Sequence, residues 1–201
     1  MRRLFSRAPD VPADVVARAG LPRGTKVLAA AGDRAGTWLL GTRDHLVVVP
    51  GSPVVEPGSP VVEPGSPVVE PGSPVVEPVE TRHIPWEQVE SAEWRRDDDR
   101  LRVSEVGEYG RPRPVHEYVI DDPGQLLAFV RERVTASVVL QRRVVVRERR
   151  GLTVVARRAP GGTGDLTWAY ELDEGLDPDD PVVREMAERG VRTAAEELGL
   201  A

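Results

Sequence analysis

The chain has 201 residues, a formal net charge of −6 and no cysteine. A chain of this length can form one ordinary domain or two small ones, and without cysteine it has no disulfides, thiolate metal sites or cysteine nucleophiles. Four of the six excess negative charges belong to a repeat within residues 50–77, so the rest of the chain has no global field that calls for nucleic acid or an anionic membrane.

The N-terminal segment, residues 1–23, starts with the basic sequence MRRLF but has no apolar stretch after it. We therefore expect no secretory signal. No window of the sequence approaches the roughly 18 apolar residues that a membrane-spanning helix needs. These features predict a cytoplasmic protein. Within this segment, residues 12–19 predict a short helix that ends at Gly20.

Residues 24–134 consist mainly of short β-rich runs separated by turn signals, which predict an antiparallel meander. The expected strands are 26–31, 37–42, 45–50, 81–86, 89–94, 100–106 and 115–120. A helix is expected over 121–134, with Asp122 as its N-cap and Pro123 at its first position. Trp38 and Trp86 lie in apolar segments, so we expect both to be buried.

Residues 50–77 contain four identical copies of a seven-residue unit with the sequence PGSPVVE. Each copy has two prolines, which exclude both a coiled coil and regular strand pairing. Packing in different environments would make the copies differ, so their identity predicts a disordered loop of GSPVVEP units, residues 50–80, inserted in the domain. The alternative interpretation is a docking ligand for an aromatic groove.

Residues 135–201 predict a second unit. Strands are expected over 137–148, 152–159 and 166–172, followed by a helix over 181–198 with Asp180 as its N-cap. The order of meander, helix, meander and helix indicates the α+β class, because it lacks the alternating βαβ pattern of a parallel sheet.

Two motifs and one helix in residues 24–134 resemble a known family. The hairpin TWLLGTRDHLVVV, the strand entry HIPWEQVESAEW and the single closing helix are similar to the bacterial pleckstrin-homology-like (PH-like) group, which includes GRAM-type relatives. The resemblance implies an antiparallel β-barrel capped by the helix, and a binding or scaffold role. The loop that holds phosphoinositides in lipid-binding members corresponds to Asp33-Arg34-Ala35 here, so lipid binding does not carry over. The resemblance does not reach 137–201.

No pattern in the sequence indicates catalysis. His45, His83 and His116 have neither the HxH nor the HExxH spacing, and the glycine-rich stretch 159–165 lacks the lysine of a phosphate-binding P-loop. The acidic run 173–180 does not have the spacing of an EF-hand loop. We therefore expect no enzyme, cofactor or metal site. The competing hypothesis is an enzyme whose site gathers His83 or His116 with carboxylates across strands.

The strongest signal is a separation of charge near the C-terminus. Residues 131–158 contain nine arginines and two glutamates, whereas 165–201 contain eleven acidic residues and three arginines. The candidate interaction surface consists of the hairpin arginines Arg142, Arg143, Arg147, Arg149, Arg150, Arg157 and Arg158. The hairpin 138–158 either binds nucleic-acid phosphates or pairs with the acidic region. We favour pairing, because the two charges nearly cancel and no aromatic residue in 138–158 can stack on a base.

Taken together, the sequence predicts a non-enzymatic interaction or scaffold module: a PH-like unit followed by a three-strand meander and a C-terminal helix. Its expected partner is a protein. Nucleic-acid binding by the hairpin 138–158 is the alternative.

Overall fold

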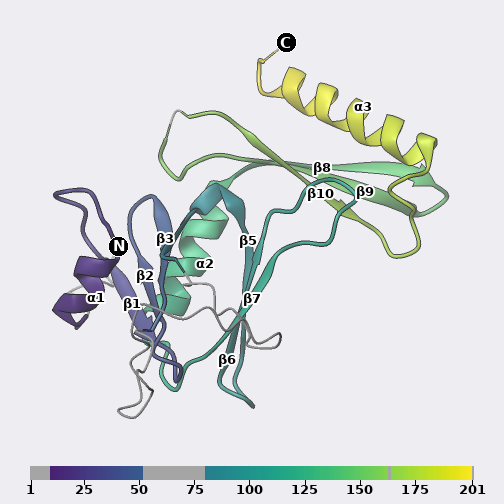
Figure 1. Cartoon of the computed structure of the whole chain (residues 1–201). Helices are drawn as coiled ribbons and strands as arrows, with labels where there is room; N and C mark the ends of the chain where they lie inside the picture. The colour runs from purple at the N-terminus through teal and green to yellow at the C-terminus, as the bar shows by residue number, and fades with distance from the viewer. Residues whose placement is uncertain (1–9, 52–79, 163, 201) are drawn as a thin grey trace, which may run out of the picture.

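The computed structural model describes residues 10–51, 80–162 and 164–200 (Figure 1). This part of the chain is α+β, with three antiparallel sheets. The expected repeat loop therefore lies almost wholly outside the described residues.

The first two sheets follow the chain order. The first joins β1 (Ala29–Gly32), β2 (Trp38–Gly41), β3 (His45–Val49) and β4 (Arg82–Pro85). A 3-10 turn, η1 (Trp86–Gln88), leads to the second, which joins β5 (Val89–Arg95), β6 (Arg100–Glu105) and β7 (Val115–Val119). Helix α1 (Ala13–Arg18) precedes them, and α2 (Leu126–Ser137) follows.

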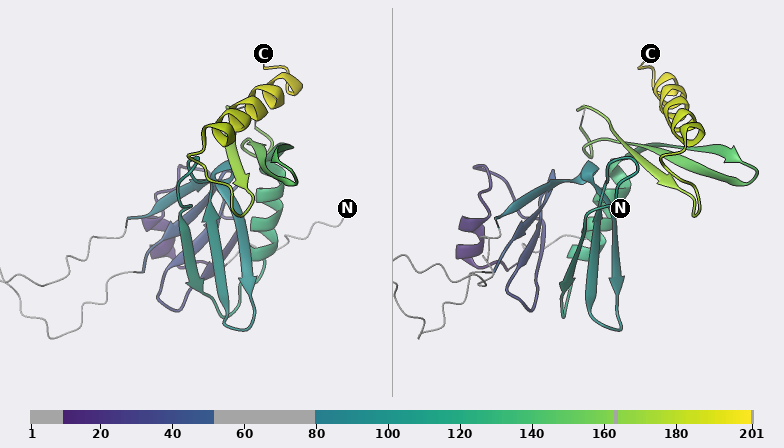
Figure 2. Two further views of the ribbon diagram at one scale, coloured as in Figure 1. Left: turned by 90° about the vertical axis from the view of Figure 1, so that its right-hand side faces the viewer. Right: turned by 45° about the vertical axis from the view of Figure 1, so that its right-hand side comes forward.

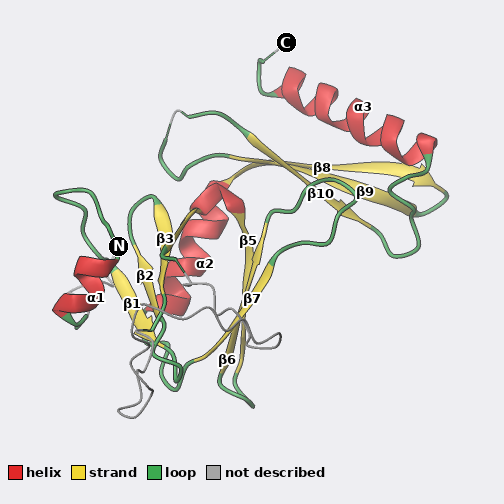
Figure 3. Ribbon diagram, viewed as in Figure 1, coloured by secondary structure: helices red, strands yellow, loops and turns green. Residues whose placement is uncertain are grey.

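The third sheet and the last helix form the C-terminal part. The sheet has the order β10 (Thr167–Leu172), β9 (Arg150–Arg157), β8 (Val138–Arg147), and α3 (Pro181–Glu197) covers one of its faces (Figure 3). Gly190 brings the helix close to the sheet, since a Cβ atom there would lie 2.8 Å from Val144 Cγ2 and 2.9 Å from Val154 Cγ2. Figure 2 shows this layer projecting away from the first two sheets.

The main core lies between the first two sheets and α2. Leu39 and Leu46 of the first sheet, Leu101 of the second, and Leu126 and Phe129 of α2 are all at most 1% exposed and belong to one cluster. The apolar residues recur with a period of two in the strands and close to 3.6 in the helix, so each element turns one face to this core.

A closed barrel, which the resemblance implied, is not found. The described strands pair as separate sheets, and η1 interrupts the path from β4 to β5. At another corner the Arg34 N–H, after β1, donates to the Val119 carbonyl of β7 at 2.9 Å. The two sheets are thus held mainly by side-chain packing in the shared core, which needs no continuous ladder of hydrogen bonds.

The prediction for the two tryptophans is confirmed for Trp86 and wrong for Trp38. Trp86 is 0% exposed, its Nε1–H donates to the Thr42 carbonyl at 3.1 Å, and its ring meets Phe129 edge-to-face at 5.8 Å. Trp38 is only half-buried. It lies on the other face of the first sheet, in a smaller cluster with Val15 of the short helix α1.

One predicted helix cap is confirmed and the other is wrong. Asp180 accepts a hydrogen bond from the Val182 N–H at 2.9 Å and caps α3. Asp122 instead accepts from the Gly124 N–H at 2.8 Å within a turn, and α2 starts at Leu126. Gly124 has a φ of 49°, a left-handed conformation that delays the start of the helix.

Deletion of residues 52–79 should leave a folded protein. The register of β3 and β4 pairs Val48 with Arg82, so joining Gly51 to Glu80 leaves residues 49–51 and 80–81, five in all, as the connection. Loops of this length are common in hairpins. Because a shorter loop costs less closure entropy, we expect a gain on the order of 1–2 kcal/mol in the free energy of unfolding. A lower thermal midpoint or a loss of cooperative melting would contradict the prediction.

Replacement of Trp86 by alanine should be strongly destabilising. It removes a fully buried ring that meets Phe129 and leaves the Thr42 carbonyl without its indole donor. We expect a loss of about 3–5 kcal/mol in the free energy of unfolding, measured by denaturant titration. The half-buried Trp38 is the matched control, and Trp38→Ala should cost clearly less. Equal losses at the two positions would contradict this account of the core.

Candidate interaction cleft

A buried arginine of the third sheet joins the two units. Arg157 of β9 is 4% exposed, and its guanidinium donates to the backbone carbonyls of Val89, at 3.2 Å, and Glu90, at 3.0 Å, on β5. It also donates to Ser137 Oγ, at 3.0 Å, at the end of α2. Burial lowers the pKa of Arg157, and the negative charges of Glu90 and Glu171 oppose that shift. One side chain therefore fixes β9 to two elements of the first unit.

A second arginine links the units from the other side. Arg113, in the loop before β7, pairs through Nε with Glu90 Oε2 at 3.1 Å and donates to the Tyr170 carbonyl of β10 at 2.9 Å. The Glu90 side chain is only 8% exposed, and burial raises its pKa while Arg113 opposes that shift. Tyr109 packs edge-to-face on Tyr170 with ring centroids 5.1 Å apart.

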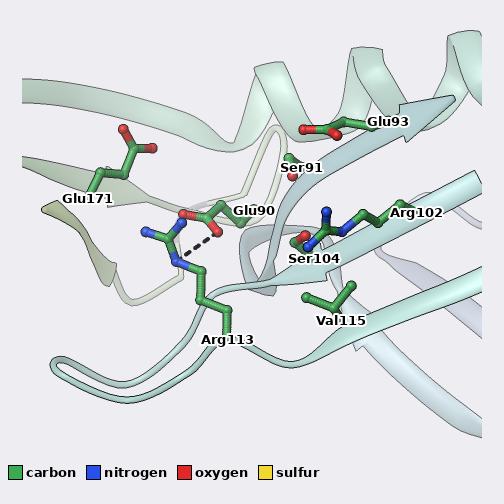
Figure 4. Close-up of a pocket in the computed structure, with 8 residues that line it drawn as sticks. All are labelled: Glu90, Ser91, Glu93, Arg102, Ser104, Arg113, Val115 and Glu171. Carbon is green, nitrogen blue, oxygen red and sulfur yellow. Dashed lines mark ion pairs between the residues drawn. The ribbon is translucent and has the colours of Figure 1, made fainter. Parts of the chain in front are cut away.

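Next to the Glu90–Arg113 pair lies an open cleft with a volume of about 510 Å³ (Figure 4). The strands of the second sheet and the loop before β7 supply most of its lining, and β10 supplies the remaining residue. The lining residues are Glu90, Ser91, Glu93, Arg102, Ser104, Arg113, Val115 and Glu171. The cleft thus lies on the second sheet, on the side where β10 approaches it.

The cleft contains charges of both signs that form no salt bridge within the described residues, although Glu93 of β5 lies directly opposite Arg102 of β6. Glu93, Arg102 and Glu171 are exposed and make no ion pair within the described residues, whereas Glu90 and Arg113 are paired with each other. Unpaired groups of this kind can form charge-assisted hydrogen bonds with a ligand. The serines that line the cleft have no histidine beside them, so the lining lacks the nucleophile–base arrangement of hydrolases.

The arginine-rich hairpin is neutralised along much of β8. Arg142 pairs with Glu197 of α3, Arg147 pairs with Asp180 at the start of α3, and Arg143 makes two hydrogen bonds to Asp173, one of them at 2.8 Å. Hydrogen bonds from Arg143 and from the Gly151 N–H lower the pKa of Asp173 to about 2. The acidic C-terminal region therefore lies against the basic strand, as the favoured interpretation of the charge pattern predicted.

The other four arginines of the candidate surface lie in different settings. Arg157 is the buried link described above, and Arg158 is half-buried with its backbone N–H donating to the Ser137 carbonyl at 2.8 Å. Arg149 and Arg150, at the turn between β8 and β9, are exposed. The seven residues thus do not form one uniform surface.

Sequence reasoning missed the cleft, whose residues come from segments spread over residues 90–171.

The three histidines do not gather in one place, and His116 is the one that an ion pair or hydrogen bond within the described residues joins to a carboxylate. His116 Nε2 lies 2.6 Å from Glu105 Oε1, and Arg82 lies beside both. His45 and His83 contact each other edge-to-face, with centroids 6.1 Å apart. Within the described residues, no group of three or more His, Asp or Glu side chains is arranged to hold a metal ion.

Comparison with known proteins gives no relative. No family model, curated protein or solved structure matches the chain. Among the described helices, none has the length and apolar character required to cross a membrane.

Neutralising the three carboxylates that pair with β8 should expose its positive charge. In the variant Asp173→Asn/Asp180→Asn/Glu197→Gln, Arg142, Arg143 and Arg147 lose their anionic partners, while Asn at 180 still caps α3. We expect binding to duplex DNA of arbitrary sequence to strengthen, with the slope of log affinity against log salt steeper by about 0.9 for each new phosphate contact. Fluorescence anisotropy of labelled duplex, repeated at several salt concentrations, measures the affinity and its salt dependence. Tight, salt-sensitive binding by the unmodified protein would contradict this prediction and favour the nucleic-acid hypothesis.

Proposed function

We propose that the protein is a non-enzymatic interaction module and that the cleft at the junction binds a segment of a partner protein. The observation that carries the proposal is the set of unpaired charges in the cleft: Glu93, Arg102 and Glu171. The other two charged residues of the lining, Glu90 and Arg113, pair with each other. A surface that keeps charges of both signs unpaired in a concave site is suited to a polar ligand that carries both signs as well.

The fold of residues 24–134 supports a binding role of the PH-like kind. Antiparallel strands followed by a single helix that packs against their shared core agree with the resemblance in element order, although the strands form two sheets and not a closed barrel. The helix contributes Leu126 and Phe129 to the shared core. We therefore propose a PH-like scaffold whose rigid surface presents the cleft.

A lipid headgroup is a poorer candidate than a protein. The loop that would hold it has one arginine, and that residue already serves carboxylates: Arg34 Nε donates to Asp121 at 2.6 Å, and its terminal nitrogen donates to Asp99 at 3.0 Å. Both hydrogen bonds raise the pKa of Arg34, with Asp121 the larger influence. A phosphate would have to displace two anions from this guanidinium.

Nucleic acid is the weaker alternative for a similar reason. Arg142, Arg143 and Arg147 already carry carboxylate partners, and Arg157 is buried in the junction. Only a minority of the hairpin arginines is therefore available to phosphates without breaking a contact within the described chain.

The cleft suggests the chemistry of the partner segment. Arg102 can receive a carboxylate, while Glu93 and Glu171 can receive lysine or arginine side chains. Val115, which is 40% exposed at the edge of the cleft, can contact an apolar side chain. We propose an extended segment that carries basic and acidic side chains with an apolar residue between them.

Site-specific photo-crosslinking in the native host tests the proposal. A photoreactive amino acid replaces Val115 at the cleft and, as the matched control, Val16 on α1, which is equally exposed at 41%. We expect an adduct with a defined protein from position 115 and none from position 16. The adduct should disappear in the Glu93→Arg/Glu171→Arg background. Identical adducts from both positions, or an adduct insensitive to the charge reversal, would overturn the proposal.

A further inference from the structure

Strand β8 forms an open edge of the third sheet. The sheet order is β10-β9-β8, and within the described residues no strand pairs with the outer side of β8, Val138–Arg147. A ten-residue edge presents a row of backbone donors and acceptors to any strand that can lie beside it. Bulges and charged side chains limit pairing at such edges, and β8 has a register shift on each side of its regular stretch together with three arginines, so any partner strand must fit the stretch between the shifts.

Two valines near the ends of this strand are exposed. Val139 is 41% exposed and Val145 is 55% exposed, which places them among the most exposed large apolar side chains of the described chain. They share one face of β8 with Gln141 and Arg143, which lie between them. The register with β9 is regular from Leu140 to Val145, and bulges lie just outside that stretch. Regular strand geometry is therefore available from Leu140 to Val145, and Val139 lies within the register shift just before this stretch.

The segment 139–145 is nearly palindromic about Arg142. Its sequence is VLQRRVV. In an antiparallel pair of two copies related by a two-fold axis through Arg142, Val139 lies opposite Val145 of the second copy. Leu140 lies opposite the second copy's Val144, and Gln141 opposite its Arg143. Opposed residues in such a pair are close enough for β-branched side chains to pack and for polar ones to hydrogen-bond.

The like charges at the axis are compensated within each copy. Arg142 would face Arg142 of the second copy, a pairing that is unfavourable between free charges. Each Arg142, however, already forms an ion pair with Glu197 of its own α3. The axis would therefore bring together two ion pairs in place of two isolated guanidinium groups.

The position of α3 allows two copies to approach. Gly190 sits against Val144 of β8 and Val154 of β9, so the helix lies over both strands. Across the two-fold axis, the two helices would be separated by about two strand spacings, roughly 10 Å. Packed helices lie about 8–10 Å apart, so the helices neither clash nor leave a wide gap.

The side of α3 that faces the open edge is partly apolar. Glu197 lies on the side of α3 nearer to β8, because it pairs with Arg142 of that strand. Arg184 and Glu188 lie on the side nearer to Tyr170 of β10. By helical periodicity Val182, which is 47% exposed, falls on the Glu197 side. The exposed valines of strand and helix thus lie on the same border of the third sheet.

We propose that a second copy of this chain binds β8 edge to edge, in antiparallel register about Arg142, and forms a two-fold dimer with a continuous six-stranded sheet. Such an interface is self-complementary, as the closed symmetry of homodimers requires. The proposal does not depend on the function of the cleft. The cleft includes β10, which is the opposite edge of the sheet, and it stays open in the dimer.

Charge substitutions at the two exposed valines test the register. Val139→Lys/Val145→Lys places lysines opposite each other at both ends of the interface, whereas Val139→Glu/Val145→Lys places each glutamate opposite a lysine of the second copy. Within one chain these positions are six residues apart, about 20 Å along the strand, so they do not pair with each other. Both positions are exposed, so each variant should fold, which melting curves check.

The full-length chain and both variants are examined by light scattering after size exclusion, over a dilution series. We expect the mass of two chains for the unmodified protein at the concentrated end, one chain for the double-lysine variant, and two chains again for the glutamate–lysine variant. An unmodified protein that has the mass of one chain at every concentration would overturn the proposal. Identical behaviour of the two variants would also overturn it, because only the proposed register distinguishes them.

Discussion

The architecture depends on one buried guanidinium. Arg157 of β9 donates to the carbonyls of Val89 and Glu90 on β5 and to Ser137 Oγ at the end of α2, so one charged group supplies hydrogen bonds to two elements of the first unit. A hydrogen bond to a charged donor stabilises by about 1.5–3 kcal/mol, and a carbonyl left unpaired costs about as much. The contacts act between units that have separate apolar cores. Arg113, which pairs with Glu90 and donates to the Tyr170 carbonyl, adds a second polar link at the same junction.

Charged side chains are arranged differently on β8 and in the cleft beside the junction. On β8, arginines pair with carboxylates of the C-terminal region, and exposed pairs of this kind contribute little to stability because solvent screens them. Their larger effect is to remove a positive field from the hairpin. At the cleft, by contrast, Glu93, Arg102 and Glu171 stay unpaired although opposite charges are near. Charges on the basic strand are therefore paired within the chain, whereas these three cleft charges form no salt bridge among the described residues.

Local sequence patterns predicted most of the elements but not how they assemble. Alternating apolar residues gave the strands, and Asp180 before Pro181 gave the start of α3, because both signals act within a few residues. Asp122 carries the same signal as Asp180, but Gly124 adopts a left-handed conformation and the helix starts later. The expected barrel was not found because packing between two sheets, which no local pattern encodes, replaces a continuous ladder.

The candidate site was beyond sequence reasoning for a related reason. Arg157 is one of nine arginines in a short stretch, and only the placement of β9 against β5 distinguishes it from its exposed neighbours. The cleft residues likewise look like ordinary surface residues in the sequence, and only the folded arrangement of β10 and the second sheet brings them together. The pairing of the basic segment 131–158 with the acidic segment 165–201 was predictable from the sequence. The two segments are neighbours in the chain, and each has a large net charge opposite in sign to the other.

The most direct test of this account is the distance between the two units in solution. Because the chain has no cysteine, cysteines at exposed Arg43 and Glu185 provide unique positions for spin labels. Pulsed electron resonance, on labelled chain diluted with unlabelled chain, should give one narrow distance distribution. The account predicts that Arg157→Ala broadens this distribution while both units stay folded. A broad distribution in the unsubstituted protein, or a narrow one that Arg157→Ala leaves unchanged, would contradict it.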